Sequence, residues 1–141
     1  MPINVIILNT FILLCLGVPG VSPYAADAEL LPDEDIRPIL LDAVETAYRY
    51  DLFNIHCRGF PGSNKLNDVD KLLAANFGLT TSDVITQYAK MDEQTYLHNL
   101  EKAFYDSIAG YGGCRAAKRH GMLEVIQTHY TGLLQMLQQI P

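Results

Sequence analysis

Apolar side chains recur at three- and four-residue steps along most of the chain, the spacing that places them on one face of a helix. The first such stripe lies between Asp35 and Gly59 and consists of Leu41, Val44, Tyr48, Leu52 and Ile55. Asp35 is expected to begin this helix, with Pro38 tolerated in its first turn because backbone donors there have no intrahelical partner. The opposite edge is expected to face water; it carries Asp42, Glu45, Arg49 and Asp51.

Turn residues end the first stripe, and a short helix follows. Residues 60–64, FPGSN, contain proline and glycine, which mark turn geometry rather than helix. The next apolar positions predict a helix over 68–77, and Gly78 stands where a left-handed residue commonly ends a helix. The inward positions are expected to be Val69, Leu72, Leu73 and Phe77.

The clearest helix start in the sequence is at Thr80. Thr80 and Asp83 have the spacing of a capping box, with Asp in place of the usual Glu or Gln. Leu79 and Val84 have the spacing of a hydrophobic staple. A third helix is therefore expected from Thr80 to about Lys90.

Two longer stripes complete the pattern. Asp92 can cap a helix that buries Leu97, Leu100, Phe104 and Ile108. The final helix is expected to bury Leu123, Ile126, Tyr130, Leu133 and Leu137. No stretch alternates apolar and polar residues as a strand would, so the predicted fold class is all-α, a bundle of four to five antiparallel helices joined by short loops.

A glycine-rich turn separates these last two helices. Gly110, Gly112 and Gly113 permit left-handed backbone angles, so the chain can turn sharply into Cys114. One or two helical turns are expected between Cys114 and His120, interrupted by Gly121.

The N-terminal apolar run has a different character. Residues 5–18 are shorter than the roughly 20 apolar residues that a bilayer-spanning helix needs, and the A-x-A motif Ala26-Asp27-Ala28 follows. This pattern predicts a signal peptide over 1–28 and a single helical domain over 29–141, in the periplasm or secreted, without stable membrane association after cleavage. The alternative is an uncleaved anchor, because no Lys or Arg precedes the run.

Two cysteines, Cys57 and Cys114, remain once the signal peptide and its Cys15 are removed. An even number of cysteines in an exported chain predicts a disulfide, and closing this loop is expected to contribute on the order of 4 kcal/mol. The alternative is a redox or nucleophilic cysteine. That role needs a CxxC partner or a facing base, and His56 is adjacent to Cys57 in sequence, so the two do not face each other on a helix.

The sequence offers no recognisable catalytic or metal-binding motif. His56, His98, His120 and His129 lack the HExxH spacing, and Ser63, Ser82 and Ser107 lie outside any GxSxG elbow. No catalytic residue, metal or cofactor is therefore predicted, and a binding protein is favoured over a small hydrolase.

The charge distribution favours a protein partner. The chain has 16 Asp and Glu against 10 Lys and Arg, a net charge of −6, which disfavours general binding to nucleic acid. Arg115, Lys118 and Arg119 nevertheless fall together just after the glycine turn, where they are expected to oppose a helix dipole at small cost. These three residues are expected to form a solvated basic edge; the functional alternative is that they steer an acidic partner, or the acidic first helix of a second copy.

Tyr111 is the candidate anchor for that partner, because a tyrosine between glycines has no helical neighbour to pack on and offers large area with few rotors. The alternative is a ring folded back onto the core. The predicted partner-binding residues are Gly110, Tyr111, Gly112, Gly113, Arg115, Lys118 and Arg119.

Residues 48–57, YRYDLFNIHC, together with Cys114, Leu123, Ile126 and Tyr130, resemble the periplasmic immunity proteins that neutralise peptidoglycan amidase effectors of the type VI secretion system. The resemblance implies an inhibitor that acts as a homodimer and blocks the amidase with the loop before its second cysteine. By position that loop is 110–113, which is short for a plug and leaves occlusion of the enzyme's surface as the expected mode. The alternative class is a periplasmic assembly factor or chaperone that holds a partner segment in a groove between helices.

Overall fold

The computed structural model describes residues 35–141, and all regular structure in that range is helical. The α-helices are α1 Arg37–Leu52, α2 Lys65–Phe77, α3 Thr81–Val84, α4 Glu93–Gly110, α5 Cys114–Arg119 and α6 Met122–Gln139. Two of them, α1 and α3, continue into π-helical segments, η1 Phe53–Cys57 and η2 Ile85–Ala89. The all-α prediction is confirmed. The predicted helices are present, and α5 corresponds to the one or two helical turns that were expected after Cys114. The predicted signal peptide lies outside the described residues.

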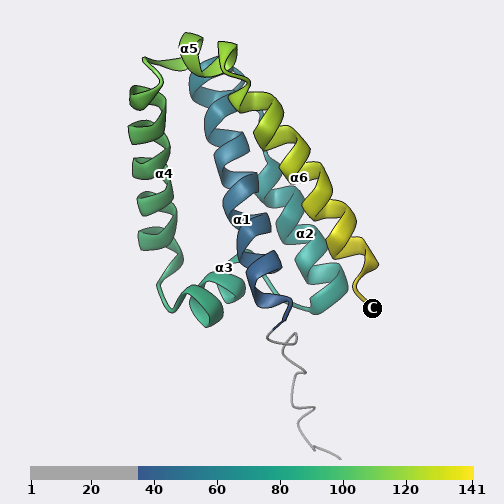
Figure 1. Cartoon of the computed structure of the whole chain (residues 1–141). Helices are drawn as coiled ribbons and strands as arrows, with labels where there is room; N and C mark the ends of the chain where they lie inside the picture. The colour runs from purple at the N-terminus through teal and green to yellow at the C-terminus, as the bar shows by residue number, and fades with distance from the viewer. Residues whose placement is uncertain (1–34) are drawn as a thin grey trace, which may run out of the picture. The chain divides into compact units, whose positions relative to one another are not determined.

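The central helix is α1, which packs against α2, α4 and α6. Figure 1 shows α1 between α4 on one side and α2 and α6 on the other. The long helices alternate in direction along the chain, so α1 runs antiparallel to α2 and α6 and in the same direction as α4 (Figure 1). None of the helices described over 35–141 is both long enough and apolar enough to cross a bilayer.

Because α1 has neighbours on several sides, its buried positions are spread around the helix, and the single predicted stripe was only partly right. Val44 and Leu52 of that stripe are buried, whereas Ile55 is 38% exposed. Other inaccessible side chains of α1 and η1 are Leu40, Ala43, Ala47 and Phe53. A periodic pattern identifies one face, and a helix at the centre of a bundle buries more than one.

Asp51 corrects the prediction that this edge of α1 faces water. Its side chain is buried, and its carboxylate caps the next helix. One oxygen, Oδ1, accepts from the Ser63 hydroxyl at 2.6 Å and from the Lys65 N–H at 2.7 Å, and Oδ2 accepts from the Leu66 N–H at 2.9 Å. These N–H groups belong to the first turn of a helix, where no intrahelical acceptor exists. The contact explains why α2 begins at Lys65 and not near residue 68 as expected.

Helices α3 and α4 begin with the caps that the sequence predicted. The capping box is present, with the Thr80 N–H donating to Asp83 at 2.8 Å and the Asp83 N–H donating to the Thr80 hydroxyl at 3.1 Å. The hydrogen bonds from Thr80 hold the pKa of the Asp83 carboxyl below its usual value. Asp92 caps α4 as predicted, accepting from the Thr95 N–H at 2.9 Å.

We expect Asp51→Asn to lower the free energy of unfolding by about 2–3 kcal/mol, because the amide presents an N–H₂ group where a buried acceptor is required. Asp106→Asn is the matched control, since Asp106 lies on the surface of α4 and bonds only Lys102 among the described residues. Urea denaturation of both variants measures the difference. Equal stability of the two variants would show that the Asp51 contacts contribute nothing specific.

Candidate functional site

The predicted partner-binding residues gather at one end of the bundle, where α4, α5 and the start of α6 meet (Figure 1). Cys57 and Cys114 are joined by a disulfide with a Cα–Cα distance of 5.2 Å, which confirms the predicted pairing. The bond connects the last residue of η1 to the first residue of α5. We call the surface around it the apical surface, defined by the exposed residues His56, Tyr105, Tyr111, Arg115, Lys118, Arg119 and His120.

The glycine turn is a compact Schellman motif. The Gly113 N–H donates to the Ile108 carbonyl at 2.9 Å, and the Gly112 N–H donates to the Ala109 carbonyl at 2.9 Å. This pair of bonds satisfies the last carbonyls of α4 and requires a left-handed residue, which Gly112 supplies with a φ of +87°. Gly110 lies within α4 as its last residue, so the turn proper is shorter than the predicted loop 110–113.

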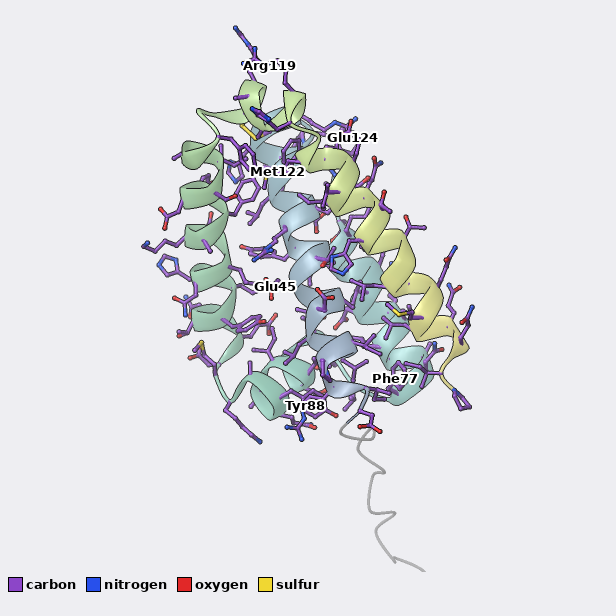
Figure 2. The ribbon with its side chains drawn as sticks, viewed as in Figure 1. Glu45, Phe77, Tyr88, Arg119, Met122 and Glu124 are labelled. Carbon is purple, nitrogen blue, oxygen red and sulfur yellow. A yellow bond between two sulfur atoms is a disulfide. The ribbon has the colours of Figure 1, made fainter. Side chains whose placement is uncertain are left out.

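Short helix α5 divides its residues cleanly between core and solvent. Ala116 and Ala117 are buried, whereas Arg115, Lys118 and Arg119 are exposed on the other side. Figure 2 shows Arg119 at the outer end of the bundle. Lys118 and Arg119 occupy the last turn of α5, where the helix dipole favours cations. The predicted opposition between this cluster and a helix dipole is therefore wrong for these two residues, because α5 ends at Arg119.

Tyr111 is 44% exposed and lies outside the hydrophobic core. Its ring centroid is 5.6 Å from that of His120, with an angle of 35° between the ring planes. His120 is itself exposed, so the contact covers one side of the Tyr111 ring without burying it. An aromatic ring with an exposed face is suited to packing against a partner.

A second tyrosine–histidine pair lies close to the disulfide and was missed in the sequence. The Tyr105 hydroxyl is 2.7 Å from Nε2 of His56, and the two rings meet edge to face at 5.1 Å. Burial and the Glu101 carboxylate raise the pKa of the Tyr105 phenol. The pair joins α4 to η1, 49 residues apart in sequence. The predicted disulfide places His56 near the end of α4, but it does not by itself pair His56 with Tyr105, which is separated from Cys114 by the glycine turn.

The remaining histidines are dispersed. His129 on α6 lies 2.9 Å from an Asp42 carboxylate oxygen on α1, and His98 lies on the surface of α4. Within residues 35–141, no group of three His, Cys, Asp or Glu side chains is arranged to hold a metal ion.

Comparisons of the chain with protein-family models, with curated proteins and with solved structures found no match.

We expect Gly112→Ala to lower the free energy of unfolding by about 1–2 kcal/mol, because a side chain at a positive φ is strained. The added Cβ would lie 3.8 Å from the Ala116 Cβ, which is ordinary contact, so the cost comes from the backbone angle. Gly110→Ala is the control, because Gly110 is helical and its Cβ would meet open space. Gly110→Ala should be neutral or slightly stabilising. Thermal unfolding of both variants measures the difference. Equal losses in both variants would contradict the assigned turn.

Proposed function

We propose that this chain is a periplasmic immunity protein whose apical surface covers the active site of an exported peptidoglycan amidase. The observation that carries the proposal is the position of Tyr111, half-exposed beside a cationic face on a turn fixed by a disulfide. Aromatic and arginine side chains are the residue types that most often dominate the affinity of protein interfaces. The identity of the partner comes from the resemblance, since exposed aromatic and basic groups alone specify only an acidic protein surface.

The charges support association with an acidic partner. The whole chain has a net charge of −6, yet Arg115, Lys118 and Arg119 face solvent together on α5. No ion pair joins these three side chains to another of the residues 35–141. Their field is therefore available to steer an acidic surface toward the apical end, which raises the association rate more than the final affinity.

The shape of the turn favours covering a cleft over entering it. The Schellman bonds and the disulfide hold residues 111–114 close to the end of α4, with Gly113 accepting from the Ala117 N–H at 3.0 Å. A turn this short reaches little beyond the bundle, so the surrounding side chains would make the contact. A rigid surface also loses little conformational freedom on binding, which favours affinity.

The alternative of a chaperone that holds an apolar segment has weaker support. The α1–α4 face contains a pocket, but Leu97 is the one aliphatic residue in its lining. A groove for an apolar segment would present a larger continuous apolar area.

We expect Tyr111→Ala to weaken inhibition of the proposed amidase partner by about 2 kcal/mol or more, because the variant removes the proposed anchor. Met136→Ala is the matched control, since Met136 is 43% exposed, almost the same as Tyr111, but lies near the C-terminal end of α6. The inhibition constant of the oxidised chain measures both effects. Equal constants for the two variants would remove Tyr111 from the interface, and no inhibition by the parent chain would reject the proposed function.

A further inference from the structure

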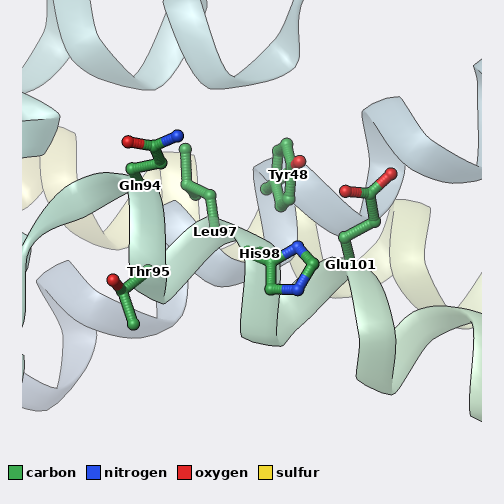
Figure 3. Close-up of a pocket in the computed structure, with 6 residues that line it drawn as sticks. All are labelled: Tyr48, Gln94, Thr95, Leu97, His98 and Glu101. Atoms are coloured by element: carbon green, nitrogen blue, oxygen red, sulfur yellow. The ribbon is translucent and has the colours of Figure 1, made fainter.

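A pocket of about 520 Å³ lies between α1 and α4, away from the cationic side chains of α5. Its lining consists of Tyr48 from α1 and Gln94, Thr95, Leu97, His98 and Glu101 from α4 (Figure 3). Its volume falls within the range of about 300–1,000 Å³ that is usual for ligand sites. We propose that this α1–α4 pocket binds the side chain of a lysine or arginine presented by a protein partner.

The α1–α4 pocket contains one carboxylate, that of Glu101. Glu101 forms no ion pair with any residue of the range 35–141. The basic residues next to the lining residues in sequence are already engaged, because Arg49 pairs with Glu45 at 2.5 Å and Lys102 pairs with Asp106 at 2.8 Å. Glu101 contacts the Tyr105 hydroxyl, but no cation of the described residues neutralises its charge, so that charge can attract a cation from outside.

The pKa of Tyr48 also indicates a negative electrostatic potential in the pocket. Burial raises the pKa of the Tyr48 phenol, and the negative charges of Glu101 and Asp51 raise it further. A field that opposes ionisation of a phenol also attracts a positive charge. The surface of α5, by contrast, is cationic, so the two sites select groups of opposite sign.

The arrangement of the side chains fits a long basic residue. Leu97 and Glu101 lie on the two sides of the Tyr48 ring in Figure 3. Gln94 lies one turn before Leu97 in α4. An aliphatic stem can pack on Leu97 and the ring while its charged head reaches the Glu101 carboxylate. The side-chain oxygens of Gln94 and Thr95 can accept the remaining N–H donors of an ammonium or guanidinium group. A neutral or acidic side chain would bring no positive charge to the Glu101 carboxylate, whose described contact is with the uncharged Tyr105 hydroxyl.

This inference is independent of the proposed amidase partner, because the pocket and the apical surface share none of their residues. The test uses the oxidised full-length chain and three small probes: the Nα-acetyl methylamides of lysine, arginine and norleucine. At constant ionic strength, backbone amide chemical shifts are followed as each probe is added. Both cationic probes should shift the amides of Gln94, His98 and Glu101, while the norleucine probe, which has an aliphatic stem but no charge, should not.

Glu101→Gln should weaken binding of both cationic probes about fivefold, which is the upper end of the range for a single partly exposed ion pair. Asp106→Asn removes the same charge from the same helix outside the pocket and should leave the affinity unchanged. The proposal is wrong if the norleucine probe binds as well as lysine, if both variants lose affinity equally, or if no probe shifts these amides. None of these results bears on amidase inhibition, so the two proposals can fail separately.

Discussion

The apical surface depends on the disulfide between Cys57 and Cys114. Helix α5 has six residues, too few for a stable isolated helix, and it buries only Ala116 and Ala117. Two alanine side chains contribute little apolar area, so packing alone holds α5 weakly. The disulfide attaches its first residue to η1, at the end of the central helix, and the Schellman bonds fix the turn before it. A covalent bond thus replaces the hydrophobic contacts that a longer helix would have provided.

The central helix links this end of the molecule to the rest. Asp51 of α1 caps α2, and Asp70 of α2 in turn accepts from the Thr81 N–H of α3 at 2.7 Å. A carboxylate on one helix therefore fixes the start of the next one twice in succession. These bonds set where α2 and α3 begin, and α1 carries both Tyr48 of the pocket and, through η1, Cys57 of the disulfide. The two proposed binding sites are positioned by the same helix.

Local patterns predicted the helices well because their signals are local. The box at Thr80, the cap at Asp92 and the left-handed residue at Gly78 each involve side chains within a few positions of one another. Asp51 was misassigned because its three donors lie 12 to 15 residues away and are brought to it only by the fold. The same reason explains the missed contact between His56 and Tyr105 and the missed pocket around Glu101. The position of the apical residues was predictable because a covalent link between two cysteines can be inferred from their number and the expected compartment.

Amide hydrogen exchange of the oxidised and the reduced chain tests most directly whether the disulfide holds the apical surface. The Gly113 and Ala117 amides donate to Ile108 and Gly113, so they report on the turn and on α5. We predict that reduction accelerates exchange at these two amides by at least tenfold, while buried positions such as Val44 and Leu73 in α1 and α2 change much less. Unchanged protection of Gly113 and Ala117 after reduction would show that the turn and α5 keep their shape without the disulfide.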